Sequence, residues 1–314
     1  MDQRIAFTVN DRLRSATALF SAASLFIAQS TGTALALPQG GQVNGGSATI
    51  TSGATQMDIN QTSNRAILDW GSFNINSGET VNFNQPNSGS VSLNRIHDAN
   101  PSQINGSLNS NGQVWLVNSQ GIAFGSGAQM NVGGLLATSS DISNNHFMNG
   151  GSIFDLPGNP LAWITNAGRI RIADGGVAAL VGPNVVNSGV VQANLGKVQL
   201  ASGDLFTLDL NGDGLISIAA SGAITSQLVE NSGSIAVQGG RVLLSVADAS
   251  NAVNSLVNMN GDITAYDLVI DSSSNGTSLI SGQINARGDN AGEKGGAVEV
   301  LRSEERRVGK ECRS

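Results

Sequence analysis

The chain has 314 residues, of which 40 are glycine, 33 asparagine, 6 proline and one cysteine, so it is short of good helix formers. Charged residues make up 12% and hydrophobic residues 40%, a balance that excludes a highly charged disordered tail. The net charge is −7 and no cluster of Lys or Arg occurs before residue 302, which argues against a nucleic-acid partner.

The N-terminal 36 residues have the pattern of a secretory signal peptide. Three arginines come first, an apolar run from Ala16 to Ala28 follows, and small residues end the segment at Ala36. The run is about 13 residues long, whereas a bilayer-spanning helix needs about 20. We therefore expect residues 1–36 to be a signal peptide rather than a membrane anchor.

The segment from Leu37 to about Gln85 is expected to cap a repetitive β structure at its N-terminal edge. Its strands are short, and it carries Trp70 and Phe73, which are large anchors in a chain with only 4% aromatic residues. Bare strand edges invite edge-to-edge aggregation and need such a cap.

Short alternating runs of apolar and polar residues recur along the chain after residue 36. Alternation with period two is typical of half-buried β-strands. Asn-Gly, Ser-Gly and Gly-Gly pairs between the runs end the strands sharply. The predicted strands contain, in chain order, Val81–Phe83, Val91–Leu93, Val114–Leu116, Ile170–Ile172, Val198–Leu200, Phe206–Leu210, Ile216–Ile218, Ile235–Val237, Val242–Val246 and Val298–Val300.

A longer repeat, Asn-x-Gly-x-Ile/Val with looser copies, places glycines at steps of 21, 44, 28 and 21 residues. We interpret these steps as a unit of roughly 22 residues with one double step and one insertion. Such units must stack to bury a core, so the sequence predicts an all-β parallel β-helix of about 12 coils over residues 37–301. Equivalent asparagines would form ladders between coils. The alternative is a β-sandwich with hairpin connections. The glycines are Gly168, Gly189, Gly233, Gly261 and Gly282.

The last 13 residues, 302–314, differ from the rest in composition. They hold eight of the 39 charged residues and the only cysteine, Cys312. The string resembles a translated sequencing adapter, so we expect a non-native tail, with the native protein continuing beyond Leu301. Residues 37–301 contain no cysteine and therefore no disulfide framework. Uninterrupted genomic coding sequence for residues 302–314 would contradict this interpretation.

Polar turns and short strands between residues 64 and 139 form a specific pattern. It consists of Asn64–Ile67, Trp70, Phe73–Ile75, Gly78–Phe83, Leu93–Ile96, Asn100–Gly106, Asn111–Asn118, Gly121–Gly125 and Val132–Ser139. The pattern resembles the N-terminal secretion domain of filamentous haemagglutinin-type exoproteins, and the resemblance covers most of residues 37–215. The chain departs from the family in two respects: Asn118-Ser119-Gln120-Gly121 stands where the family usually has Asn-Pro-Asn-Gly, and the family's other motif, Asn-Pro-Asn-Leu, is not found.

The resemblance implies a right-handed parallel β-helix and export by two-partner secretion in Gram-negative bacteria. In that system the N-terminal domain addresses the exoprotein to an outer-membrane barrel transporter through periplasmic peptide-binding domains. The expected product is secreted or exposed at the cell surface. Residues 37–215 would be the secretion domain, and residues 216–301 would be further β-helical repeats at the start of a truncated passenger.

Polar turn residues within the motif are the candidates for transporter recognition and folding nucleation, because they can carry an address in a chain of otherwise similar strands. The alternative is that they only end strands. The candidates are Asn64, Arg65, Asn94, Arg95, Asn100, Pro101, Asn118 and Gly121.

Few residues have the pattern of a metal or catalytic site. Asp209, Asn211 and Asp213 begin like a calcium loop, but the twelfth position is Ala220 where a bidentate Glu is needed, which favours a turn over weak Ca²⁺ binding. His97 and His146 lack a metal-binding context and are interpreted as loop residues. We expect no cofactor.

Two classes of function compete. The favoured one is a non-catalytic secretion domain of a large adhesin that binds a host-cell or surface glycan or protein, with cytolysin and haem-scavenging exoproteins of the same secretion class as alternatives. The other is a β-helical polysaccharide-processing enzyme, which needs clustered carboxylates with an Arg or Lys base. Low charge density argues against the enzyme.

Overall fold

The computed structural model describes residues 37–208, 217–274, 276–286 and 295–301. The expected signal peptide, the candidate calcium residues Asp209, Asn211 and Asp213, and the tail 302–314 lie outside the described residues. The predicted domain boundary at residue 215 also falls outside them and stays a prediction.

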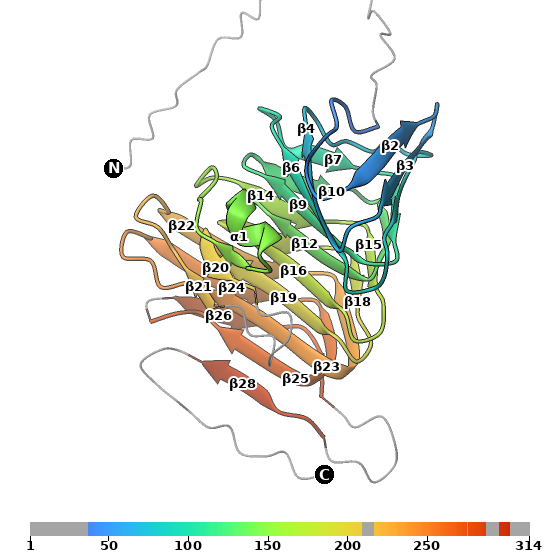
Figure 1. Cartoon of the computed structure of the whole chain (residues 1–314). Coiled ribbons are helices and arrows are strands. Elements are labelled where there is room, and N and C mark those ends of the chain that lie inside the picture. The colour runs from blue at the N-terminus through green and yellow to red at the C-terminus, as the bar shows by residue number, and fades with distance from the viewer. Residues whose placement is uncertain (1–36, 209–216, 275, 287–294, 302–314) are drawn as a thin grey trace, which may run out of the picture. The chain divides into compact units, whose positions relative to one another are not determined.

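Within this region the chain winds into coils, and equivalent strands of successive coils pair in parallel to form three stacks (Figure 1). The first stack consists of β3 (Gln56–Gln61), β5 (Thr80–Asn84), β8 (Ser107–Ser110), β11 (Gln129–Val132), β15 (Arg169–Ile172), β18 (Val190–Gln192), the first parts of β23 (Ser234–Val246) and β25 (Asp262–Asp271), and β27 (Ile284–Asn285). The second consists of β4 (Arg65–Trp70), β6 (Val91–Ile96), β9 (Gln113–Asn118), β12 (Gly134–Thr138), β16 (Val177–Gly182), β19 (Lys197–Ser202), the last parts of β23 and β25, and β28 (Val298–Leu301).

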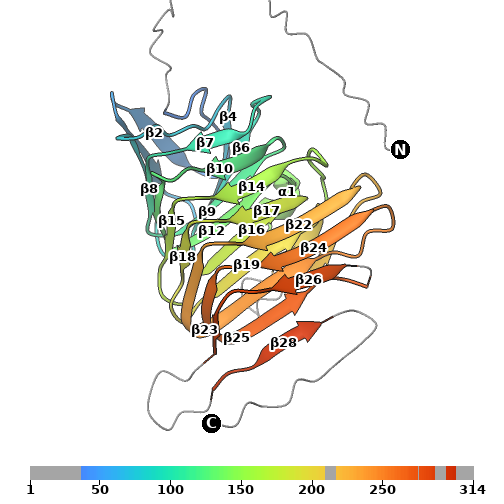
Figure 2. The ribbon, with the colours of Figure 1, turned by 180° about the vertical axis from the view of Figure 1, so that it is seen from behind.

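The third stack faces the viewer in Figure 2 and completes each coil. Its strands are β7 (Ser102–Ile104), β10 (Gly121–Phe124), β14 (Trp163–Asn166), β17 (Asn184–Asn187), β22 (Ser226–Asn231), β24 (Asn254–Met259) and β26 (Thr277–Ile280). The inward side chains of all three stacks form one continuous hydrophobic core. The predicted parallel β-helix is therefore confirmed, and the sandwich alternative is wrong.

Each predicted alternating run that lies within the described residues falls on a strand. In β6, however, the apolar pair Val91 and Leu93 faces outward, and the inward positions are Ser92 and Asn94, both fully buried. Alternation therefore located the strands but did not tell which face is the inside, because both faces of this stack are buried.

The predicted coil count is wrong, because long steps in the glycine repeat are single coils. Val191 of β18 pairs directly with Ile235 of β23, so the 44-residue step is one coil with an excursion rather than two coils. Another excursion, which comes earlier in the chain, separates Asn131 from its partner Arg171. The first stack accordingly has nine strands in the described part of the chain instead of about 12.

The repeated glycines lie at one corner of successive coils, with no room between them for a side chain. A Cβ atom at Gly189 would lie less than 3.0 Å from the carbonyl oxygen of Gly168, and the same holds for Gly233 against Gly189 and for Gly261 against Gly233. Since the Cβ would point along the stacking direction at this corner, only glycine allows the coils to reach hydrogen-bonding distance.

The predicted asparagine ladder is confirmed inside the helix. Asn166 Nδ2 donates to Asn187 Oδ1 at 2.7 Å, and Asn187 Nδ2 donates to Asn231 Oδ1 at 2.7 Å. All three side chains are buried. The ladder ends where Met259 takes the next position, and Asn231 Nδ2 has no hydrogen-bond partner there.

The N-terminal cap is shorter than predicted. Strands β1 (Gln42–Gly45) and β2 (Ala48–Ser52) pair antiparallel to β4 and β3 and so cover the first coil. The first coil itself already begins at β3, because β3 pairs in parallel with β5. Trp70 and Phe73 belong to that coil, where their buried rings meet edge to face with centroids 5.4 Å apart.

Two excursions leave the second stack and cover its outer face. The first, residues 139–162, contains α1 (Asn144–Met148) and β13 (Ile153–Phe154), and the second contains β20 (Leu205–Thr207) and β21 (Ser217–Ala219). Strands β13, β20 and β21 form a small antiparallel sheet. The excursions and the outward side chains of the stack enclose a second hydrophobic cluster. In this cluster the ring of Phe154 stacks on that of Phe206, with the ring centroids 4.5 Å apart. No helix in the described ranges is long and apolar enough to span a membrane.

Breaking the asparagine ladder at its centre should destabilise the fold. We expect Asn187→Ala to lower the free energy of unfolding by about 2–4 kcal/mol, because it leaves buried polar atoms of Asn166 and Asn231 without a partner. The control Asn84→Ala removes the exposed hydrogen bond to Asn60 and should cost less than about 0.5 kcal/mol. Urea denaturation measures both, and equal losses would contradict the role of the ladder.

Adding one methyl group at the glycine corner should also be costly. We expect Gly233→Ala to lower the free energy of unfolding by about 1–3 kcal/mol, because the new Cβ collides with the backbone of Gly189. In the control Gly222→Ala, the Cβ would meet only Asn251 Nδ2, at an ordinary 3.5 Å. A Gly233→Ala protein as stable as the Gly222→Ala protein would disprove close stacking at this corner.

Candidate recognition site

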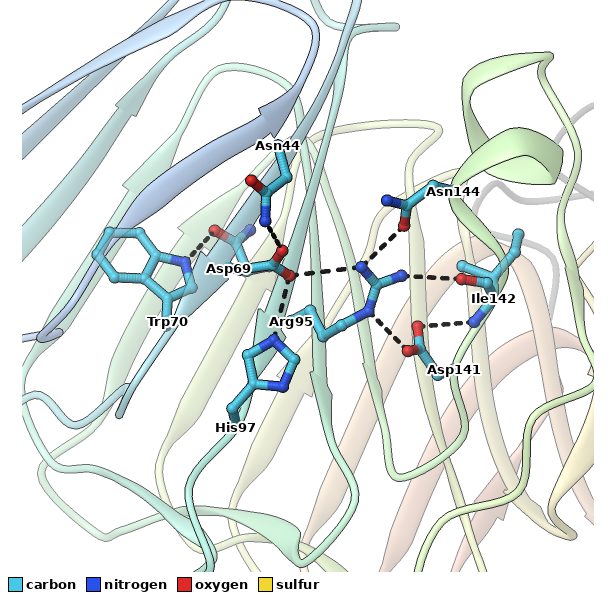
Figure 3. Close-up of polar contacts among 9 residues, drawn as sticks. Asn44, Asp69, Trp70, Arg95, His97, Asp141, Ile142 and Asn144 are labelled. Carbon is cyan, nitrogen blue, oxygen red and sulfur yellow. Dashed lines mark hydrogen bonds and ion pairs between the residues drawn. The ribbon is translucent and has the colours of Figure 1, made fainter.

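Arg95 is the residue among the predicted candidates with the most extensive contacts (Figure 3). It projects from the outer face of β6, and its Nε donates to Asp141 Oδ2 at 2.6 Å. Its other nitrogens donate to Asn144 Oδ1 and to the carbonyl oxygen of Ile142, both at 2.9 Å, and its Nη1 lies 3.4 Å from Asp69 Oδ1. One guanidinium therefore joins the second coil to the first excursion.

The electrostatics of Arg95 favour this pairing. Burial disfavours the charged form and lowers the pKa, whereas hydrogen bonding to Asp141 and the charges of Asp141 and Asp69 raise it, and the net pKa lies above the ordinary value. A half-buried guanidinium with two carboxylates and a carbonyl as acceptors is a strong, geometrically specific contact.

The cap is connected to the same network through Asp69 of β4. Asn44 of β1 donates from Nδ2 to Asp69 Oδ2, and His97 Nε2 lies 3.4 Å from Asp69 Oδ1 (Figure 3). The network therefore spans the cap, the first two coils and the excursion. His97 lies in a loop as predicted, whereas His146 lies on α1, so its placement in a loop was wrong.

Arg65 provides a second link between the coils and the excursion. Its Nη1 donates to the carbonyl oxygen of Phe147 at 2.9 Å. Its guanidinium carbon lies 4.7 Å from the centre of the Phe147 ring and 5.8 Å from that of Trp115, and burial lowers its pKa. Both candidate arginines therefore hold residues of the excursion against the second stack.

Asn94 lies inside the helix and is fully buried. Its Oδ1 accepts a hydrogen bond from Trp70 Nε1 at 3.1 Å, and its Nδ2 donates to the side chain and carbonyl oxygen of Ser92. The indole N–H of the cap-proximal tryptophan thereby finds an acceptor in the core. In the folded state Asn94 therefore has a structural role and is not accessible to solvent or to a partner protein.

Four other candidates, Asn100, Pro101, Asn118 and Gly121, lie at the corner between the second and third stacks. Asn118 Nδ2 donates to the carbonyl oxygen of Asn100 at 3.1 Å and to Ser102 Oγ at 3.0 Å, and Asn118 is fully buried. Gly121 is also buried and has φ of 112°, and a Cβ there would collide with the carbonyl oxygen of Trp163. Pro101, next to Asn100, is exposed.

Asn64 stands apart from both groups, in the exposed turn before β4, where its Oδ1 accepts a hydrogen bond from Asn87 Nδ2 at 3.3 Å. The structure therefore brings four candidates together at one corner and sets two arginines against the excursion, while Asn94 lies in the core.

The first excursion also contacts the Asn118–Gly121 turn, in which Ser119 is exposed and Gln120 half-buried. Asn159 donates from its backbone N to the carbonyl oxygen of Ser119 at 2.9 Å and from Nδ2 to Gln120 Oε1 at 3.1 Å. Beside these contacts lies a cleft of about 510 Å³, lined by residues of the turn, of the His97–Ala99 loop and of the excursion.

Sequence reasoning missed the partners of the candidate residues. Asp141, Ile142 and Asn144 follow Arg95 by 46 to 49 residues, a separation that no local motif marks. Their positions on the excursion could be found only once its packing is known. In the described part of the chain, no group of three or more His, Cys, Asp or Glu residues could hold a metal ion.

The fold alone does not define a function, which has to come from comparison with known proteins. The chain matches the TPS secretion domain family over residues 34–300 and belongs to it. It is similar to the HMW1 secretion domain from Haemophilus influenzae, with a TM-score of 0.74 and 29% identity over 84% of this chain and 70% of that chain.

Two curated relatives are Heme/hemopexin-binding proteins from Haemophilus influenzae. One, from strain ATCC 51907 / DSM 11121 / KW20 / Rd, is 37% identical over 207 residues, which are 63% of this chain and 22% of the relative. The other is 32% identical over 257 residues, 73% of this chain and 26% of the relative. The chain thus spans about a quarter of the length of these relatives.

Family membership defines the chain as a secretion-addressing domain of an exoprotein that is exported across the outer membrane. It also implies a dedicated outer-membrane transporter as partner. The resemblance noted in the sequence is thereby confirmed.

The Arg95–Asp141 contact should be strongly coupled. In a double-mutant cycle of Arg95→Gln and Asp141→Asn we expect an interaction energy of about 1–2 kcal/mol, because both side chains are largely buried and the hydrogen bond is charge-assisted. The matched pair Arg241–Asp267, at 3.7 Å and more exposed, should give about 0–0.5 kcal/mol. Urea denaturation of both cycles tests this, and similar couplings would refute it.

Proposed function

We propose that the transporter recognises this domain as an extended chain, before the β-helix forms. The supporting observation is the burial of Asn94, Asn118 and Gly121, which leaves nothing of these residues for a partner to contact once the coils are stacked. In an extended chain the same residues are accessible to periplasmic peptide-binding domains of the transporter.

The same residues then serve a second purpose outside the cell. Asn94 accepts the hydrogen bond of the buried Trp70 indole N–H next to the cap, and Asn118 donates a hydrogen bond to Asn100 at the corner between two stacks. Because each coil pairs only with its neighbours, folding proceeds from the capped N-terminal coils onward. The free energy gained as each coil is added opposes return of the chain into the periplasm. The alternative, that these residues only end strands and fasten corners, predicts normal recognition of their variants.

For the exoprotein as a whole we propose a surface-exposed or released adhesin, with haem capture as the second candidate. The names of the two curated relatives, Heme/hemopexin-binding protein, favour haem capture, although the match covers about a quarter of each. Binding of the full-length exoprotein to host cells and glycans, measured beside its binding to haem and hemopexin, separates the candidates. A cytolysin would lyse cells in the same assay.

We propose no enzymatic activity and no cofactor for this domain. The charged side chains of the recognition site are engaged in structural contacts, as Arg95 is with Asp69 and Asp141. Release of reducing sugar from plant or bacterial polysaccharides by the purified protein would instead favour the polysaccharide-processing alternative.

Export should depend on the buried corner residues. We expect the double variant Asn118→Ala/Gly121→Ala to accumulate in the periplasm, with secretion reduced at least about tenfold, because the address is altered. Secreted and periplasmic fractions from cells that carry the transporter measure this effect. The control Asn131→Ala changes only an exposed ladder hydrogen bond to Asn109 and should be secreted normally. Normal export of the double variant would remove both residues from the recognition site.

A further inference from the structure

The outer face of the first stack carries the side chains that alternate with the core residues of its strands. Inward residues such as Met57, Leu108 and Ile170 belong to the core, so their neighbours in the sequence point outward. We call the outward surface of β3, β5, β8, β11, β15 and β18 the polar face, and its side chains are exposed or half-buried. Strand pairing sets them in rows, one of which consists of Asp58, Asn82, Asn109, Asn131, Arg171 and Gln192.

The amides of this row form a ladder that retains hydrogen-bonding capacity toward the outside. Asn82 Nδ2 donates to Asp58 Oδ1 at 2.8 Å, and Asn109 Nδ2 donates to Asn82 Oδ1 at 3.0 Å. Asn131 Nδ2 donates to Asn109 Oδ1 at 3.2 Å. Because a side-chain amide has two N–H donors and two acceptor lone pairs, each one retains groups for a ligand. The coils space these groups about 4.8 Å apart, close to the length of one sugar in an extended polysaccharide.

Arg169 and Arg171 bring two positive charges to the polar face. Both are exposed, and they lie two residues apart on β15, about 7 Å along the strand. The nearest acidic residue in the sequence, Asp174, lies in the turn after the strand. The outward positions of the two coils on either side are uncharged: Gln129, Asn131, Val190, Gln192, Ser107, Asn109, Ser234 and Ala236. The polar face is therefore positive around β15, although the chain has a net charge of −7.

The contacts of these two arginines differ from those of the other arginines in the described part of the chain. Arg95 and Arg241 form ion pairs, and Arg65 contacts a carbonyl oxygen and two aromatic rings. Within the described ranges, neither Arg169 nor Arg171 has a side-chain partner of this kind. Their guanidinium groups are therefore available to an anionic ligand, and a planar guanidinium matches the two oxygens of a carboxylate.

We propose that the polar face binds an acidic polysaccharide built from uronate sugars. Arg169 and Arg171 pair with its carboxylates, and the amide ladder forms hydrogen bonds with hydroxyl groups of sugars along the same polysaccharide chain. A linear polysaccharide fits because the ladder ends at Asn131, which pairs directly with Arg171, so the amides and the charge lie in one line. The folded secretion domain thereby has a ligand of its own, separate from the transporter that recognises the extended chain and from whatever the rest of the exoprotein binds.

The experiment measures binding of the purified folded chain to two linear polyuronates, polygalacturonate and alginate. Physiological salt screens charges more than about 8 Å apart, so close contacts dominate. Methyl-esterified polygalacturonate lacks the carboxylates, and polyglutamate has carboxylates without sugar hydroxyls. Dextran sulfate and phosphatidylglycerol vesicles present other anions.

The variants are Arg169→Gln, Arg171→Gln and Asn109→Ala, with Arg241→Gln as the matched control. Arg241→Gln removes the same charge from a site outside the polar face. Urea denaturation verifies that each variant is folded.

We expect the better of the two polyuronates to bind at least about tenfold more tightly than methyl-esterified polygalacturonate or polyglutamate. Arg169→Gln and Arg171→Gln should each weaken this binding at least about fivefold and Asn109→Ala about threefold, whereas Arg241→Gln should change it less than about twofold. Equal losses in Arg171→Gln and Arg241→Gln would overturn the site, because they would show a general effect of charge. Failure of both polyuronates to bind, or tighter binding of polyglutamate, dextran sulfate or the vesicles, would also overturn it.

Discussion

Pairing of each strand with its equivalent in the next coil is the constraint from which the rest of this structure follows. Because identical backbone positions lie directly above one another, the same corner must accommodate the same backbone approach in every coil, and at Gly189, Gly233 and Gly261 only hydrogen atoms fit. The same stacking sets Asn166, Asn187 and Asn231 one above another, so that each amide satisfies the next in a buried environment. At the N-terminal end, antiparallel strands β1 and β2 occupy the edge that the stack would otherwise expose.

The second stack obeys an additional requirement, since it is apolar on both faces. Its inward side chains join the common core, and its outward ones, from Val91 and Leu93 onward, need a cover that the coils themselves do not provide. The two excursions supply it, and charged and aromatic contacts of Arg65 and Arg95 attach the first of them. Among the residues that carry the family resemblance, Arg65 and Arg95 thus attach the first excursion in the folded domain, and Asn118 links two strands at a corner.

The fold could be predicted from the sequence because its determinants are local and repeated. Alternation located the strands, and the spacing of corner glycines identified the coils and the buried asparagine ladder. The number of coils could not be predicted, because a 44-residue step is equally compatible with two coils and with one coil that carries an excursion, and only the pairing of Val191 with Ile235 decides between them.

The candidate site could be predicted only in part, for the opposite reason. Its residues were found in polar turns, but what they contact depends on segments far away in the sequence, such as Asp141 for Arg95 and Phe147 for Arg65. Asn94 has the appearance of a solvent-exposed strand residue, yet it faces inward because the register pairs it with the buried Leu68 of β4, and its Oδ1 accepts a hydrogen bond from Trp70 Nε1.

The small sheet formed by β13, β20 and β21 has a mechanical consequence. The excursion with β13 leaves the second stack after β12, and the excursion with β20 leaves it after β19; strand β16 lies between β12 and β19 in the stack. The antiparallel pairing of β13 with β20 and the stacked rings of Phe154 and Phe206 therefore connect three neighbouring strands across their outer face. Tension applied along the stacking direction would break the strand pairing between the coils beyond β23 one coil at a time. Strands β12, β16 and β19 could separate under the same tension only if the pairing of β13 with β20 and the stacking of Phe154 on Phe206 were also broken.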